Sequence, residues 1–172
     1  RKYAAMVGLE SNYTIYDVDD AGRALRRAMA AAGIAQATPD AVRNAISWAK
    51  NNLISAEAYK PRAGNALGLA VAEVYPVYQS LLMQANAVDF DDLLLHVAML
   101  LRANRELRAQ LDRRWRFILV DEYQDTNLAQ YAIARALSID YPNLAATGDP
   151  DQSIYGWRGA NLNNILEFER DF

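Results

Sequence analysis

The sequence predicts a mainly α-helical chain with a partial α/β element in its second half. Helix-start signals and apolar residues at helical spacing fill the first half of the chain. Two short apolar runs, residues 117–120 and 144–147, each lead into acidic residues and flank a helical segment. Continuous apolar runs are typical of parallel strands covered on both faces, and a strand, helix and strand in this order form a βαβ unit.

Three helices are expected in the first half of the chain, which is therefore predicted to be all-helical. Asp17 suits the N-cap of a helix that ends near Gly33, because its carboxylate can accept hydrogen bonds from free N–H groups of the first turn. A second helix starts at Pro39, a position where the missing N–H costs nothing. A third spans about residues 65–85, and Pro76 inside it predicts a kink or a break just before the proline.

After residue 88 the sequence predicts both helices and strands. A helix opens at Asp89, and a short arginine-rich helix covers about residues 105–113. The helix between the two expected strands spans about residues 128–138. Ligands of open α/β sheets bind at the carboxyl ends of the strands, and both acidic clusters lie there.

Composition excludes several classes of protein. The chain has 172 residues, of which 52% are hydrophobic and 23% charged, so wholesale disorder is excluded. Its net charge of -3 provides no global basic field, so any nucleic-acid binding must use a local patch. The absence of cysteine excludes disulfides and thiolate metal sites and fits a reducing cytosol. No membrane span or signal peptide is recognisable, so we expect a cytoplasmic chain. We also expect the sequence to be an excerpt of a longer protein.

Asp121 and Glu122 come directly after the first apolar run. An aspartate at the end of a strand can hold Mg²⁺, and a neighbouring glutamate can orient or deprotonate an attacking water. Acidic residues after strands are also common as turn and helix-cap residues. By themselves, the two carboxylates leave both interpretations open.

Four segments of the chain resemble motifs of one enzyme family. They are VDEYQDTN at residues 120–127, GDPDQSIYGWRGA at 148–160, DFDDLL at 89–94 and YTIYD at 13–17. Together, and in their order along the chain, they resemble the UvrD/Rep family of superfamily 1 DNA helicases over essentially the whole chain. The first two segments correspond to helicase motifs II and III.

The resemblance implies a domain organisation. Residues 1–16 would lead in from the ATPase core, 17–88 would form a helical insertion subdomain, and 89–172 would form part of a RecA-like, P-loop NTPase domain with an incomplete parallel sheet. The phosphate-binding pattern G-x-x-x-x-G-K-[ST] does not occur in the chain. We therefore expect an internal fragment that is inactive alone, within a parent that is an ATP-dependent DNA helicase.

The resemblance also implies roles for individual residues. Asp121 and Glu122 would together bind Mg²⁺, Glu122 would also be the catalytic base, and Gln152 would sense the γ-phosphate of ATP. A turn-stabilising amide is the alternative for Gln152. The residues expected to contact single-stranded DNA are Tyr155, Trp157, Arg158 and Phe90, for which core packing of the rings is the alternative.

The expected partners are ATP and single-stranded and duplex DNA, in repair or replication at the nucleoid, with repair or replication proteins as further candidates. The alternatives are a non-catalytic DNA- or partner-binding module and a helicase–nuclease subunit. Because two strands leave sheet edges unpaired, we expect residues 117–147 to self-associate or to be poorly ordered.

Overall fold

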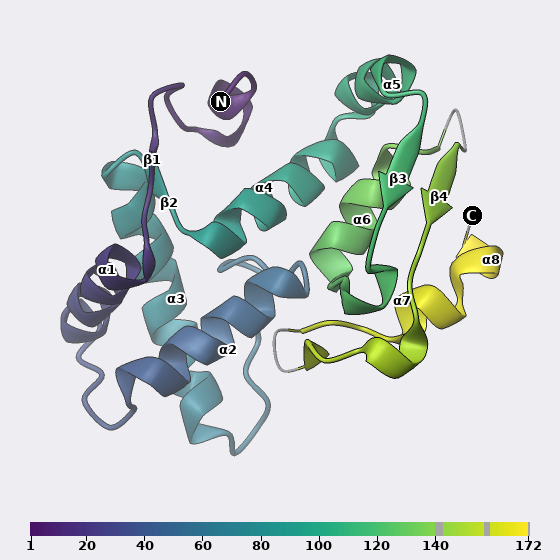
Figure 1. The fold of residues 1–172 in the computed structure, drawn as a ribbon. Helices are drawn as coiled ribbons and strands as arrows, with labels where there is room; N and C mark the ends of the chain where they lie inside the picture. The colour runs from purple at the N-terminus through teal and green to yellow at the C-terminus, as the bar shows by residue number, and fades with distance from the viewer. Residues whose placement is uncertain (140–142, 157–158, 172) are drawn as a thin grey trace. The chain divides into compact units, whose positions relative to one another are not determined.

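The computed structural model describes residues 1–139, 143–156 and 159–171 (Figure 1). It divides into two compact units. Unit 1 comprises Arg1–Lys50 and Ile54–Leu93, and unit 2 comprises Asn51–Leu53 and Leu94–Phe172. Most described residues are helical, and there are two small parallel sheets, β1–β2 and β3–β4. The predicted combination of a mainly α chain with a partial α/β element is thereby confirmed.

Unit 1 is built around three helices that share one hydrophobic core. Its elements are η1 (Ala4–Val7), β1 (Thr14–Ile15), α1 (Val18–Ala31), α2 (Pro39–Asn51), α3 (Ala66–Gln84), β2 (Ala87–Val88) and the start of α4 (Phe90–Ala103). The core contains Leu25 from α1, Val42 and Ile46 from α2, and Val71 and Val74 from α3. These residues recur at helical spacing, so each helix turns one apolar stripe inward.

The predicted start and stop of α1 are confirmed. Asp17 accepts hydrogen bonds from the N–H groups of Asp19 and Asp20, at 3.0 and 2.8 Å. Gly33 follows the end of the helix with φ = 67°, a left-handed conformation that glycine adopts without steric cost.

One expectation for unit 1 was wrong. The first half is not all-helical, because β1 pairs in parallel with β2. Each strand has only two residues, too few for a periodic pattern in the sequence. Of the two effects expected at Pro76, a kink or a break, the break is absent, because α3 continues through the proline. Val74, Tyr75 and other α3 residues are buried on both sides of the proline, and tertiary packing of this kind supports a helix that has lost one hydrogen bond.

Among the described residues, α3 is the one helix long and apolar enough to cross a membrane by length and composition alone. A buried helix in a protein core meets the same criteria. Seven residues of α3 are buried, among them Val71, Tyr75 and Leu82 in the core of unit 1. A core helix explains the apolar composition of α3 without a membrane.

Unit 2 contains the predicted βαβ element. The parallel strands pair with the register Ile118↔Leu144 and Val120↔Ala146. Its elements after α4 are α5 (Arg105–Arg114), β3 (Ile118–Val120), η2 (Tyr123–Asp125), α6 (Leu128–Ala136), β4 (Leu144–Ala146), η3 (Pro150–Gln152), α7 (Asn163–Leu166) and α8 (Phe168–Asp171).

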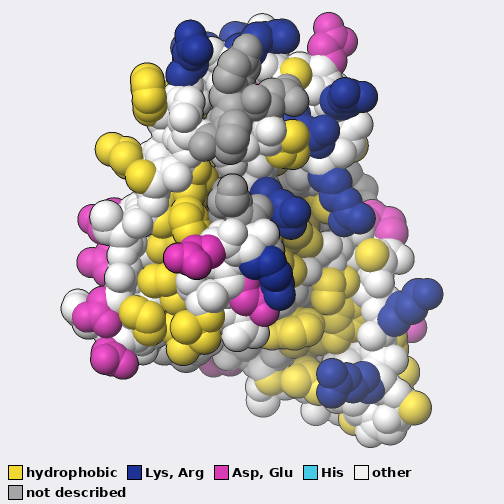
Figure 2. Space-filling view, turned by 90° about the vertical axis from the view of Figure 1, so that its right-hand side faces the viewer, with side chains coloured by type: hydrophobic (Ala, Val, Ile, Leu, Met, Phe, Trp, Pro, Cys, Tyr) yellow, Lys and Arg dark blue, Asp and Glu magenta, His cyan; other side chains and the backbone are white. Residues whose placement is uncertain are grey.

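The expectation that both faces of this sheet are covered was wrong within the described part of the chain. Phe117 is 82% exposed and Leu119 in β3 is 84% exposed. Residues two apart on a strand point to the same side, so these side chains mark one uncovered face of the sheet. Hydrophobic side chains also stand at the surface among charged ones on the face drawn in Figure 2.

Candidate functional site

The candidate site lies where β3 and β4 end. Asp121 follows β3 and Thr147 follows β4, and the Thr147 hydroxyl donates a hydrogen bond of 2.5 Å to Oδ1 of Asp121. The Glu122 N–H donates to the same oxygen at 2.9 Å. These two hydrogen bonds hold the pKa of the exposed Asp121 carboxyl below its usual range, and the bond from Thr147 has the larger effect. An ionised carboxylate therefore stands at the carboxyl edge of the sheet at neutral pH.

Glu122 has an unusual backbone conformation. Its φ is +51°, in the left-handed region, which a residue other than glycine adopts at a cost on the order of 1–3 kcal/mol. Strained backbone of this kind clusters at functional sites, where neighbouring contacts hold it. Here Nε2 of Gln124 donates a hydrogen bond of 2.7 Å to Oε2 of Glu122.

Gln124 is a central residue of the site that the sequence analysis did not identify. Its side chain is buried, and its Oε1 accepts a hydrogen bond of 3.0 Å from the Asp149 N–H. One amide thus joins the Glu122 carboxylate, after β3, to the backbone after β4. The only signal in the sequence is a glutamine two positions after the glutamate, which does not reveal a long-range bridge.

Gly148 makes room for this bridge. A Cβ atom at this position would lie 2.5 Å from Oε1 of Gln124 and 3.1 Å from the backbone nitrogen of Tyr123. Real Cβ atoms essentially never approach other atoms as closely as 2.5 Å. A side chain at this position would therefore displace the Gln124 amide from its bridging position.

Gln152 lies in the turn after Asp149, and both side chains are exposed. Nε2 of Gln152 donates a hydrogen bond of 2.7 Å to Oδ2 of Asp149. This bond, together with one from the Asp151 N–H, lowers the pKa of Asp149. The structure shows this turn-stabilising contact, and the contact of Gln152 with a phosphate remains a prediction.

The residues expected to contact DNA are distributed over both units. Tyr155, in unit 2, is 39% exposed, and its neighbour Ile154 donates its N–H to Oδ1 of Asp125 at 3.3 Å. Trp157 and Arg158 lie outside the described residues. Phe90 belongs to unit 1, where it is 59% exposed and lines a pocket of about 270 Å³, so its ring is not packed in a core.

Further contacts within unit 2 hold the segment that follows the carboxylates. Nδ2 of Asn164 donates to the carbonyl and the hydroxyl oxygens of Thr126, both at 3.1 Å. The Asn161 N–H donates to the same carbonyl at 2.9 Å. The ring of Tyr123 meets that of Phe168 edge-on at 5.3 Å between centroids. Residues after 158 thus help to fix the conformation of residues 123–126.

The carboxylates at the ends of β3 and β4 would supply only one or two ligands to a magnesium ion, and waters and nucleotide phosphates would supply the others. Within the described parts of the chain, no three or more His, Cys, Asp and Glu residues gather where they could hold a metal. Mg²⁺ in nucleotide sites is bound through one or two carboxylates, waters and substrate phosphates, so such a cluster is not needed. Both hydrogen bonds described for Asp121 use Oδ1, and Oδ2 takes part in neither.

Comparison with known proteins identifies the family. Residues 1–172 match the family model described as the UvrD/REP helicase N-terminal domain. The chain is 44% identical over 187 residues to the ATP-dependent DNA helicase UvrD1 of Mycobacterium tuberculosis, covering 100% of this chain and 24% of the relative. It is 41% identical over 174 residues to the ATP-dependent DNA helicase PcrA of Leuconostoc citreum, covering 100% of this chain and 23% of the relative.

The PcrA helicase of Bacillus subtilis is 36% identical over 168 residues, covering 96% of this chain and 23% of the relative. The chain therefore spans about a quarter of the length of the relatives that it matches. The match of the family model over all 172 residues shows that the chain belongs to the UvrD/REP helicase family.

Proposed function

We propose that this chain is part of an ATP-dependent DNA helicase that couples ATP hydrolysis to movement along single-stranded DNA and to unwinding of duplexes. In this proposal, residues 1–16 lead in from the ATPase core and 17–88 are a helical insertion. Residues 89–172 are part of a RecA-like domain. The names of the relatives, all ATP-dependent DNA helicases, support the activity, and the parallel β3–β4 pair with carboxylates at its end supports the site.

The carboxylates are given separate roles. Asp121 would bind Mg²⁺, an ion that offsets the charge of the nucleotide phosphates when it is bound. Glu122 would accept a proton from the attacking water as general base. Its hydrogen bond from Gln124 holds the carboxylate in one place without neutralising it, since an amide carries no charge.

The Gln124 bridge is the observation that carries the proposal. It connects Glu122, beside which hydrolysis would occur, to Asp149, at the start of the turn that contains Gln152. This turn leads directly to Tyr155, a proposed DNA contact. A change in Gln152 on loss of the γ-phosphate therefore has a short physical route to the DNA-binding segment.

DNA binding is assigned to three aromatic rings and one arginine. Tyr155, Phe90 and Trp157 would stack on bases, and Arg158 would bind a phosphate. Stacking contributes about 1–3 kcal/mol per base and reads no sequence, which suits an enzyme that moves along DNA. A role in repair or replication, on nucleoid DNA in the cytoplasm, is part of the same proposal.

The chain by itself is proposed to be inactive. It contains no G-x-x-x-x-G-K-[ST] segment, whose backbone N–H groups and lysine hold the phosphates in P-loop enzymes. Without these groups, the Asp121 and Glu122 carboxylates would face the nucleotide with little positive charge to bind it.

Two substitutions in the full-length protein test the roles of the carboxylates. Glu122→Gln is expected to keep ATP binding and to lose most of the DNA-stimulated turnover. Asp121→Ala is expected in addition to weaken the dependence on Mg²⁺. Glu169→Gln, which changes an exposed glutamate in α8, is the matched control and should retain the wild-type rate. Near-normal hydrolysis in both site variants would assign Asp121 and Glu122 to turn and cap roles instead.

A further inference from the structure

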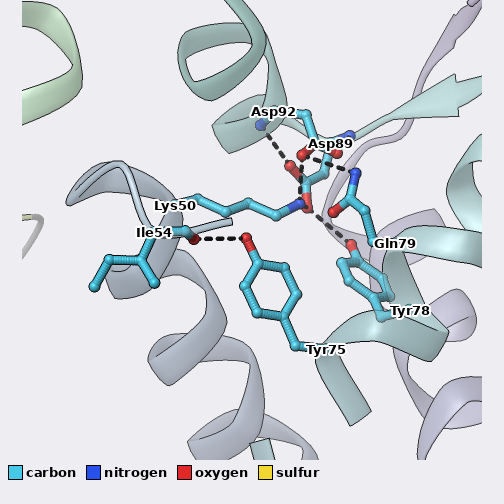
Figure 3. A network of polar contacts seen from close by, with 7 residues as sticks. All are labelled: Lys50, Ile54, Tyr75, Tyr78, Gln79, Asp89 and Asp92. Carbon is cyan, nitrogen blue, oxygen red and sulfur yellow. Dashed lines mark hydrogen bonds and ion pairs between the residues drawn. The ribbon is translucent and has the colours of Figure 1, made fainter. Parts of the chain in front are cut away.

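Unit 1 contains a lysine that is completely buried. Lys50 lies in the last turn of α2, and its side chain is 0% exposed. Its Nζ lies 2.7 Å from Oδ2 of Asp89 and 2.7 Å from Oδ1 of Asp92, as Figure 3 shows. The ammonium also lies 5.1 Å from the ring centroid of Tyr78, on α3. One cation thus connects α2 to the residues that begin α4.

The same two carboxylates cap the N-terminus of α4. Oδ1 of Asp89 accepts the Asp92 N–H at 2.8 Å, and Oδ2 of Asp92 accepts the Asp89 N–H at 3.2 Å. This reciprocal arrangement is that of a capping box, in which the cap residue and the third helical residue satisfy each other's N–H groups. Each carboxylate uses its second oxygen for Lys50. The helix start and the ion pairs therefore depend on the same side-chain orientations.

Helix α3 completes this cluster, which we call the lysine cluster (Lys50, Tyr78, Gln79, Asp89 and Asp92). The Tyr78 hydroxyl donates to Oδ2 of Asp89 at 3.0 Å, and Nε2 of Gln79 donates to Oδ1 of Asp92 at 3.2 Å. Burial by itself would raise the pKa of Asp89, but the Lys50 ammonium and the hydrogen bonds outweigh it and keep that pKa below its usual range. The carboxylate is therefore ionised at neutral pH.

Phe90 follows the capping aspartate and is the first residue of α4. Its ring is exposed and helps to form the pocket described above, together with Asp89, Tyr78 and residues of α1 and α2. The direction of a side chain at the first helical position follows from the backbone of the cap. The lysine cluster therefore fixes the backbone from which the Phe90 side chain projects.

We propose that Lys50 is a positioning residue for single-stranded DNA binding: through Asp89 and Asp92 it fixes the start of α4 and thereby holds the Phe90 ring in place to stack on a base. The inference rests on the proposed DNA-binding role of Phe90. A buried ion pair is poor evidence of stabilisation, because hydrophobic residues of similar volume often stabilise a core equally well. The lysine cluster instead imposes one orientation on a helix start beside an exposed ring.

A double-mutant cycle in the full-length protein separates positioning from general stabilisation, since two residues that act through one contact are not additive. The affinity for a short single strand is measured for wild type, Lys50→Met, Phe90→Ala and the double variant. Phe90→Ala is expected to weaken binding by ~5- to 150-fold. Lys50→Met is expected to weaken it by a similar or smaller factor, and the double variant should bind no more weakly than Phe90→Ala alone.

Further variants keep the test decisive. Lys60→Met removes an exposed lysine and should bind as wild type does. If Lys50→Met does not fold, Tyr78→Phe removes one hydrogen bond to Asp89 and enters the same cycle. Losses that multiply in the double variant would overturn the inference, as would unchanged binding in Phe90→Ala. A wild-type protein that neither hydrolyses ATP nor binds DNA would instead refute the proposed function itself.

Discussion

Replacing Lys50 with methionine should destabilise unit 1 strongly at neutral pH. Methionine keeps most of the aliphatic chain but removes the charge and all three donors, leaving Asp89 and Asp92 together without the cation that lies 2.7 Å from each. Removal of one partner from a buried ion pair costs about 3–5 kcal/mol, because the remaining charge stays buried. Lys50 has no exposed surface, so solvent does not screen the loss.

The size of this effect should depend on pH. In the wild type the pKa of Asp89 is depressed, so its contribution to the free energy of unfolding is present above its unfolded pKa of ~3.9 and is lost as pH falls through the depressed folded value. Without Lys50, burial dominates and raises the folded pKa above the unfolded one. The stability of the variant should then fall as pH rises through the raised value. The difference between the two proteins therefore widens from about pH 4 to pH 7.

Urea unfolding followed by circular dichroism at several pH values measures this difference, and hydrogen exchange of α2 and α3 assigns it to unit 1. Lys60→Met is the control and should unfold as wild type does. Lys50→Met/Asp89→Asn should be more stable than Lys50→Met alone, because the new amide removes one buried charge and can donate to Asp92. A loss below ~1 kcal/mol that does not change with pH would refute the reasoning about a buried charge.

The other predictions concern unit 2 and the isolated chain. Gly148→Ala should displace Gln124 and lower DNA-stimulated ATP turnover in the full-length protein, and turnover equal to that of wild type would show that the bridge is dispensable. Thr147→Val removes the main cause of the depressed pKa of Asp121, so this pKa should rise toward ~3.9 in a carbon-detected NMR titration, and an unchanged pKa would contradict the assignment. The isolated 172-residue chain should show no DNA-stimulated ATPase. Because Leu119 and Phe117 are exposed, it should either self-associate through residues 117–147, seen by light scattering, or leave them poorly ordered, seen by hydrogen exchange. A monodisperse monomer with slow hydrogen exchange throughout residues 117–147 would contradict this last prediction.

Local chemistry explains why much of the secondary structure could be predicted. The cap at Asp17, the proline at position 39 and the left-handed Gly33 act within a few residues, so the sequence reveals them directly. The two apolar runs also revealed the parallel strands β3 and β4. That α3 continues through Pro76 depends on burial elsewhere in the helix, which local rules do not include.

Long-range contacts explain what the sequence did not reveal. Lys50 and Asp89 are 39 positions apart, and nothing in either segment shows that they meet. Gln124 contacts the backbone 25 positions later. By contrast, Asp121 and Glu122 were identified because the resemblance to a helicase family supplied their proposed roles. Their mutual arrangement with Thr147 and Gln124 required the structure.

Strand displacement by the full-length protein tests the proposed function most directly. A labelled strand annealed to a longer single strand is incubated with protein and Mg²⁺, with and without ATP. We predict displacement that requires ATP, that is lost in Glu122→Gln and that is retained in the control Glu169→Gln. Displacement by Glu122→Gln at the wild-type rate, or DNA binding by the wild type without any ATP-dependent displacement, would contradict the proposal.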